Sequence, residues 1–109
     1  MAMGNGIPAF RVVTPEGARA QLRDWGKVAT EAGLLAAYLD DLKLLNIRLG
    51  RRPKSFGDPI YDYKNARLCL YRGLTNFLVV HYAVHVARPL VFVQSVRLRP
   101  DRPLGESPQ

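Results

Sequence analysis

The sequence predicts an α+β fold in which one antiparallel β-sheet is covered by a hairpin of two helices. Residues 66–98 form three runs rich in Val, Leu, Phe and Tyr, separated by Gly, Asn or Pro, which is the pattern of strands joined by hairpins. Residues 15–49 instead carry apolar side chains at the spacing of amphipathic helices. A chain of 109 residues favours one domain, which we expect over residues 10–99.

The two helices are predicted over residues 15–32 and 34–49. Pro15 suits the first position of a helix, and Gly33 suits a left-handed stop between the two. Gly50 is the expected end of the second helix. Because the link between the helices is so short, we expect them to form an antiparallel pair.

The three main strands are predicted over residues 66–72, 77–85 and 90–98. The middle run is apolar at almost every position, which is typical of a central strand covered on both faces. A short β-prone segment at 9–13 is expected to add an edge strand. Residues 50–65 contain two Pro and two Gly and are predicted to form a basic loop that carries aromatic side chains.

The ends of the chain and its single cysteine bear on location. Residues 1–9 and 100–109 lack periodicity and are rich in Gly or Pro, so we expect both tails to be disordered. No apolar run approaches the roughly 18 residues that span a bilayer, so no membrane association is expected. The N-terminus does not read as a secretory signal, and the lone Cys69 cannot form an internal disulfide. These features favour a cytoplasmic protein, with Cys69 in the core.

Charge is the first indication of function. The net charge is +7, and it is unevenly placed: residues 1–47 hold five basic and five acidic residues, whereas 48–109 hold eleven basic and four acidic. A basic half of this kind favours a polyanionic partner such as nucleic acid, the ribosome or an acidic protein. The alternative is a charged surface that only keeps the protein in solution.

Basic and aromatic side chains are mixed around the predicted loop and strands, and this mixture can hold phosphates and stack bases. The tyrosines could equally seal the loop against the sheet, and the basic cluster near residue 51 could complement the helix dipole. The candidate nucleic-acid-binding residues are Arg51, Arg52, Lys54, Tyr61, Tyr63, Lys64 and Arg97.

His81 and His85 are the only histidines, and a spacing of four residues puts both on the same face of a strand. Either could act as a general base near pH 7. The alternative is a pair of half-buried strand residues that bond to their neighbours. Two histidines without further ligands make an incomplete metal site, so no metal is expected, and no motif predicts a cofactor.

The run FLVVHYAV (77–84), which ends in Tyr-x-Val, is followed by a turn and by LVFVQSVRLR (90–99). This pattern, together with the element order and the Phe-Gly-Asp-Pro segment at 56–59, resembles the RelE/ParE toxin superfamily. The resemblance implies a toxin that an antitoxin protein holds inactive. RelE-like members cut mRNA in the ribosome without a metal, whereas ParE-like members inhibit DNA gyrase. It also implies a monomer or a toxin–antitoxin hetero-oligomer.

The nuclease residues that the resemblance implies are only partly present. Arg67 and Arg99 fall on basic positions of the RelE-like pattern, but Cys69 and an apolar residue near Val79 replace two others. The C-terminal Tyr or His of RelE-like nucleases is absent. The candidate catalytic residues are Arg67, Arg99, His81 and His85. We therefore expect a RelE/ParE-like toxin with little nuclease activity; the alternatives are a non-catalytic RNA- or protein-binding module and a gyrase inhibitor.

Overall fold

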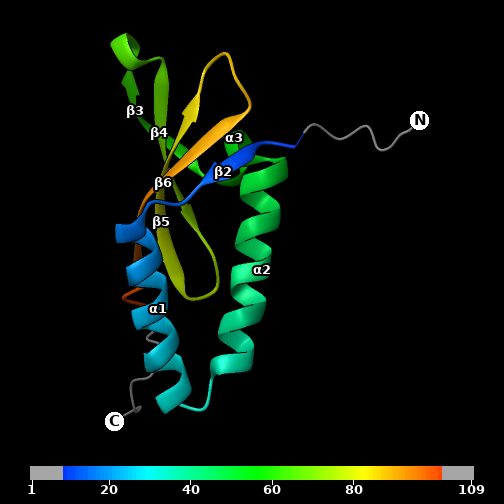
Figure 1. Cartoon of the computed structure of the whole chain (residues 1–109), viewed down its shortest axis with the longest axis vertical. Coiled ribbons are helices and arrows are strands. Elements are labelled where there is room, and N and C mark those ends of the chain that lie inside the picture. Colours follow the sequence, from blue (N-terminus) through cyan, green and yellow to red (C-terminus); the bar gives the residue numbers. More distant parts are fainter. Residues whose placement is uncertain (1–8, 102–109) are drawn as a thin grey trace, which may run out of the picture.

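A computed structural model of the chain describes residues 9–101 (Figure 1). It confirms the α+β class. The predicted disorder of the tails falls almost entirely on residues outside this range. In chain order the elements are β2 (Arg11–Val13), α1 (Glu16–Glu31), α2 (Leu35–Arg51), α3 (Pro53–Phe56), β3 (Asp58–Tyr63), a 3-10 turn (Lys64–Ala66), β4 (Leu68–Leu74), β5 (Leu78–His85) and β6 (Leu90–Leu98).

The sheet has five strands in the order β2-β6-β5-β4-β3, so β5 is the central strand, as predicted. The prediction of a purely antiparallel sheet is wrong, because β2 pairs in parallel with β6 while all other neighbours are antiparallel. The chain between β2 and the meander passes through both helices, and a long helical connection of this kind permits parallel pairing, which a tight hairpin cannot.

The prediction that residues 50–65 form a loop is also wrong, because the segment contains α3 and the edge strand β3. Pro59 argues against a central strand, but Pro is tolerated at an edge, and the pairing with β4 shifts register between Pro59 and Tyr61. Every residue of β3 is exposed, so the segment lacks the apolar alternation that would have revealed a strand. Arg67, with φ 57°, turns the chain from β3 into β4, which therefore begins at Leu68.

The helix ends agree with the predictions to within two residues. Gly33 has φ 73° and separates α1 from α2, as predicted. Pro15 is the residue before α1, not its first residue, and Gly50 does not stop α2, which continues to Arg51. The Tyr38 hydroxyl of α2 donates a 2.7 Å hydrogen bond to the carbonyl of Leu22 in α1 and so fixes the two helices side by side.

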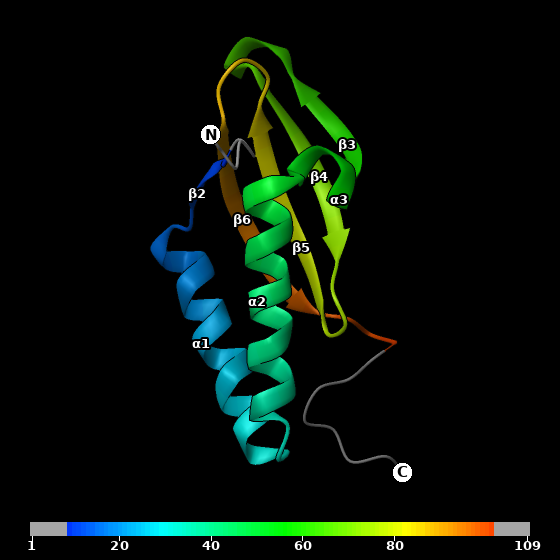
Figure 2. The same ribbon diagram turned by 90° about the vertical axis from the view of Figure 1, so that its right-hand side faces the viewer.

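Both helices lie on one face of the sheet (Figure 2). Alternate residues of β5 point toward them and are buried, together with those of β6 and a few helical residues: Ala18, Ala29, Tyr38, Leu45, Leu49, Leu78, Val80, Tyr82, Val84, Val91, Val93 and Val96. Within residues 9–101, no helix covers the opposite face, which we call the open face. For the part of the chain that the structure describes, the expectation that both faces of the central strand are covered is therefore wrong.

Two polar side chains of α1 complete the pairing of β6. Because β2 pairs only with residues 90–92 of β6, the rest of that edge needs other partners. The Gln21 side-chain oxygen accepts a 2.8 Å hydrogen bond from the Val96 N–H, and the Trp25 ring N–H donates a 2.9 Å bond to the Val96 carbonyl. Helix α1 thus replaces a strand at this edge and holds β6 in place.

Helix α3 packs against the helix-covered face beside β4. Its Phe56 ring stacks on the ring of Tyr82, with the ring centroids 5.8 Å apart. The Tyr82 hydroxyl donates a 2.6 Å hydrogen bond to the Pro53 carbonyl. At Gly57 the backbone passes so close to the sheet that a Cβ atom would lie 2.5 Å from the Arg72 carbonyl oxygen. A residue without a side chain is required there.

Candidate nucleic-acid interface

The open face carries a row of polar side chains that crosses four strands. The register places Asp58 of β3 beside Arg72 of β4, Arg72 beside His81 of β5, and His81 beside Ser95 of β6. Arg97 follows two residues after Ser95 and lies on the same face. Arg72 and Arg97 are exposed, whereas His81 and Ser95 are half-buried. The open face therefore presents one guanidinium group on each side of an imidazole.

The surroundings of His81 disfavour its charged form. Burial lowers the pKa of His81 below its ordinary value, and the positive charges of Arg72 and Arg97 lower it further. Because the ordinary value is 6.5, the ring is mainly uncharged at pH 7. Its Nδ1 atom lies 3.3 Å from the Ser95 hydroxyl. An uncharged imidazole between two cations can accept a proton and so join the arginines in binding an anion.

Next to the polar row the open face is apolar and aromatic. Leu70 of β4 lies beside Ala83 of β5, which lies beside Phe92 of β6. Tyr61 and Tyr63 of β3 extend this patch to the edge of the sheet. Their rings pack edge to face with centroids 4.6 Å apart, and Tyr61 is 59% exposed. Such a surface can take the flat face of a base while the arginines hold the backbone.

The other candidate histidine has a structural explanation. His85 is on the same face as His81, as predicted, but it lies at the end of β5. Its Nδ1 atom accepts hydrogen bonds from the N–H groups of Ala87 and Arg88, both at 3.0 Å. These bonds order the turn between β5 and β6, so this nitrogen is not available to a substrate.

Arg67 and Arg99 do not meet. Arg67 is exposed at the tip of the β3–β4 hairpin, where its carbonyl accepts a 2.9 Å bond from the N–H of Val86. The Arg99 N–H bonds the Phe77 carbonyl at 2.8 Å, at the other end of the sheet. The length of β4, about 20 Å, separates the two ends. The two basic positions that the toxin resemblance implies are thus too far apart to hold one phosphate.

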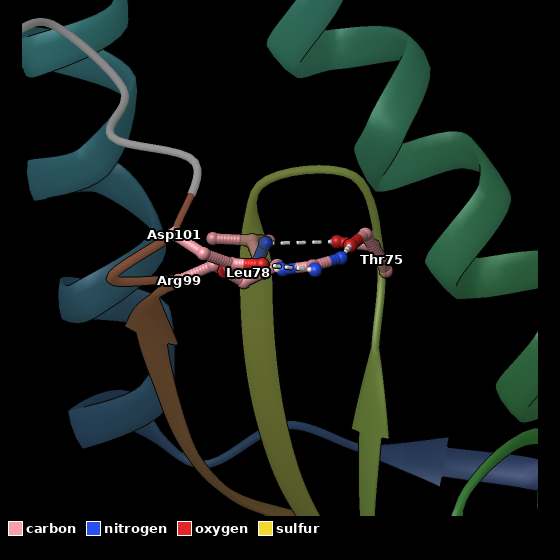
Figure 3. A network of polar contacts seen from close by, with 4 residues as sticks. All are labelled: Thr75, Leu78, Arg99 and Asp101. Atoms are coloured by element: carbon pink, nitrogen blue, oxygen red, sulfur yellow. Dashed lines mark hydrogen bonds and ion pairs between the residues drawn. The ribbon is translucent and has the colours of Figure 1, made fainter.

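Arg99 instead holds the end of β6 to the turn between β4 and β5 (Figure 3). Its Nη1 donates a 2.9 Å bond to the Thr75 carbonyl, and its Nε and Nη2 bond the two oxygens of Asp101 at 3.0 and 2.7 Å. Only 20% of the Arg99 side chain is exposed. Figure 3 also shows Thr75 and Leu78 bonded to each other across this turn.

A buried carboxylate closes the same turn from the helical side. Asp41 of α2 is 1% exposed and accepts a 2.6 Å bond from the Thr75 hydroxyl. It also accepts bonds from the N–H groups of Asn76 and Phe77, at 2.9 and 3.0 Å. Sequence reasoning did not single out Asp41. Its partners lie more than 30 residues away in the chain, so helical periodicity alone could not reveal them.

The structure divides the candidate nucleic-acid-binding residues among three places. Arg97 is on the open face, and Tyr61, Tyr63 and Lys64 are near the tip of the β3–β4 hairpin. Arg51, Arg52 and Lys54 lie at the end of α2 and in α3, on the side of the sheet that the helices cover. Arg72 was missed, because only the strand register shows that it faces His81. Cys69 is half-buried on β4.

Comparisons with protein-family models, with curated proteins and with solved structures find no match. Within residues 9–101, no three His, Cys, Asp or Glu side chains lie close enough together to hold a metal ion. No helix in this part of the chain is both long and apolar enough to span a membrane.

Proposed function

We propose that this protein binds RNA on its open sheet face and acts on translation as a RelE/ParE-like toxin, with an antitoxin as its natural partner. The observation that carries the proposal is the row of Arg72, His81 and Ser95, with Arg97 beside it, next to the exposed tyrosines of β3. The element order of the resemblance, a strand and two helices followed by the meander, supports the toxin class.

The two arginines would contact different phosphates. Arg72 and Arg97 lie two strands and two residues apart, which places their Cα atoms roughly 12 Å from each other. His81 and Ser95 lie between them, and the tyrosines of β3 lie on the edge strand, toward the tip of the β3–β4 hairpin. Single-stranded RNA laid across this face would place phosphates on the arginines and bases on the rings, without the need for a particular sequence.

The geometry favours binding over cleavage. Cleavage needs several groups that stabilise charge at one phosphate, and removal of one such group costs about 2.7–4 kcal/mol of transition-state stabilisation. Arg67 is far from Arg99, and Arg99 is held by Thr75 and Asp101. Arginine cannot act as the base, because it does not lose its proton in proteins. His81 is the candidate base that remains on the open face.

The proposal is tested in a cell-free translation reaction. We expect the purified chain to slow protein synthesis as its concentration rises, with few or no new mRNA ends in a primer-extension assay on the same samples. Strong cleavage in the ribosomal A site would contradict the non-cleaving mode, and its loss in His81→Ala would then assign the base to His81. Normal translation together with inhibition of DNA gyrase would instead favour the ParE-type alternative.

RNA affinity should depend on pH through His81. A phosphate bound between Arg72 and His81 favours the charged imidazole, so binding should tighten as the pH falls from about 7.5 to about 5.5. The charged groups around this ring are Arg72 and Arg97 and, beyond Arg72, Asp58. The dependence should be much reduced in His81→Gln, because neither arginine nor a phosphodiester titrates in this range and His85 lies at the end of β5 with its Nδ1 bonded to the turn. Equal pH dependence in both proteins would rule His81 out.

The free protein should become less stable over the same fall in pH that tightens RNA binding. Folding lowers the pKa of His81, so the unfolded chain binds the proton more readily than the folded one. The contribution of His81 to stability is therefore present above its ordinary pKa and is lost as the pH falls toward the lowered value. Binding must be measured where the protein remains folded.

A further inference from the structure

The chain carries a second surface, away from the open face, with a different chemistry. A groove of about 560 Å³ runs between the C-terminal half of α2 and α3. Its apolar residues are Leu44, Ile47 and Phe56, and Ile47 is 52% exposed. Three arginines, Arg48, Arg51 and Arg52, line the rest of it together with Ser55, and none of the described residues that line it is acidic.

We propose that this groove binds an acidic amphipathic helix from a partner protein. Leu44 is three and four residues before Ile47 and Arg48, and Arg51 is four and three residues after them, so all four lie along one side of α2. A helix laid against this side could place apolar side chains on Leu44 and Ile47. Its Asp or Glu side chains could then bond the arginines, whose planar groups match a carboxylate.

The groove suits a protein segment better than a nucleic acid. Leu44 and Ile47 are aliphatic and offer no ring for a base to stack on. The one ring in the groove, Phe56, already stacks on Tyr82 at 5.8 Å and lies under the Arg48 guanidinium at 5.6 Å. A base would have to displace one of these neighbours, whereas an aliphatic side chain would not. The charge favours acidic residues at the rim of the apolar floor.

The proposal does not depend on the proposed RNA binding, because the groove shares no residue with the open face. The probe is a fluorescent synthetic peptide of about 14 residues, close to four helical turns, with Leu along one side and Glu on the flanks. A peptide of the same composition in scrambled order and a peptide with Lys in place of Glu are the controls. Binding to the full chain is followed by fluorescence anisotropy.

We expect the acidic amphipathic peptide to bind and both control peptides to fail. Arg51→Glu should weaken binding by about tenfold or more, because it replaces attraction by repulsion. Lys43→Glu is the matched control, since Lys43 is exposed on the same helix but does not line the groove, and it should bind normally. Circular dichroism shows whether the reversed charge disturbs folding. If it does, Arg51→Gln, which only removes the charge, is used for the binding measurement instead.

Three results would overturn the proposal. The first is equal binding of the peptide to Arg51→Glu and to the unaltered chain, and the second is no binding to either. The third is loss of RNA binding, with no change in peptide binding, in Arg51→Glu; the groove would then belong to the nucleic-acid interface. Peptide binding that persists in an Arg72→Ala, Arg97→Ala chain separates this proposal from the proposed function, since either can then fail alone.

Discussion

Replacement of Asp41 by alanine is expected to lower the free energy of unfolding by about 3–5 kcal/mol, a large part of the 5–15 kcal/mol typical of a small domain. The carboxylate accepts three hydrogen bonds from the turn between β4 and β5 while itself being 1% exposed. Without it, two backbone N–H groups and the Thr75 hydroxyl lose their acceptor inside the protein. Chemical denaturation monitored by circular dichroism measures the effect.

Asp40 provides the matched control for this prediction. It is adjacent in α2 and exposed, so Asp40→Ala should change the stability by only about 0.5 kcal/mol. Asp41→Asn should lie between the two, because the amide oxygen can still accept a bond while the amide nitrogen faces a donor. An Asp41→Ala protein as stable as Asp40→Ala would show that the turn does not need the carboxylate.

Removal of Arg72 and Arg97 together is expected to weaken the binding of single-stranded RNA by about thirtyfold at low salt, if each exposed phosphate contact contributes about 1 kcal/mol. Both side chains are exposed on the open face, and the structure gives neither a place in the apolar core. The double variant should therefore keep its melting temperature. Fluorescence anisotropy with a labelled oligoribonucleotide measures the affinity.

Local sequence signals predicted much of the fold. The apolar spacing of α1 and α2 and the runs that became β4, β5 and β6 depend on neighbours in the chain, and these elements lie where they were expected. Strand β3 was missed because an exposed edge strand needs no apolar alternation. The parallel pairing of β2 with β6 depends on the path of the chain through both helices, which no local pattern records.

The candidate site was less predictable, because it depends on register. The sequence pointed to His81 and Arg97, but Arg72 faces His81 only through the pairing of β4 with β5. Arg99 looked like a phosphate ligand from its position after the last strand. Its partners Thr75 and Asp101 show that it fastens the strand ends. Contacts between distant segments decided both cases.

The salt dependence of RNA binding tests the proposed interface most directly. Each phosphate contact on a single strand contributes about 0.7 to the slope of log affinity against log salt. Substitution of alanine for Arg72 and Arg97 should therefore reduce the slope by about 1.4. Alanine at Lys27 and Lys43, which are exposed on the helices, should leave it nearly unchanged. An unaltered slope in the Arg72 and Arg97 variant, with loss of slope when Arg51, Arg52 and Lys54 become alanine, would contradict the open face as the RNA-binding surface.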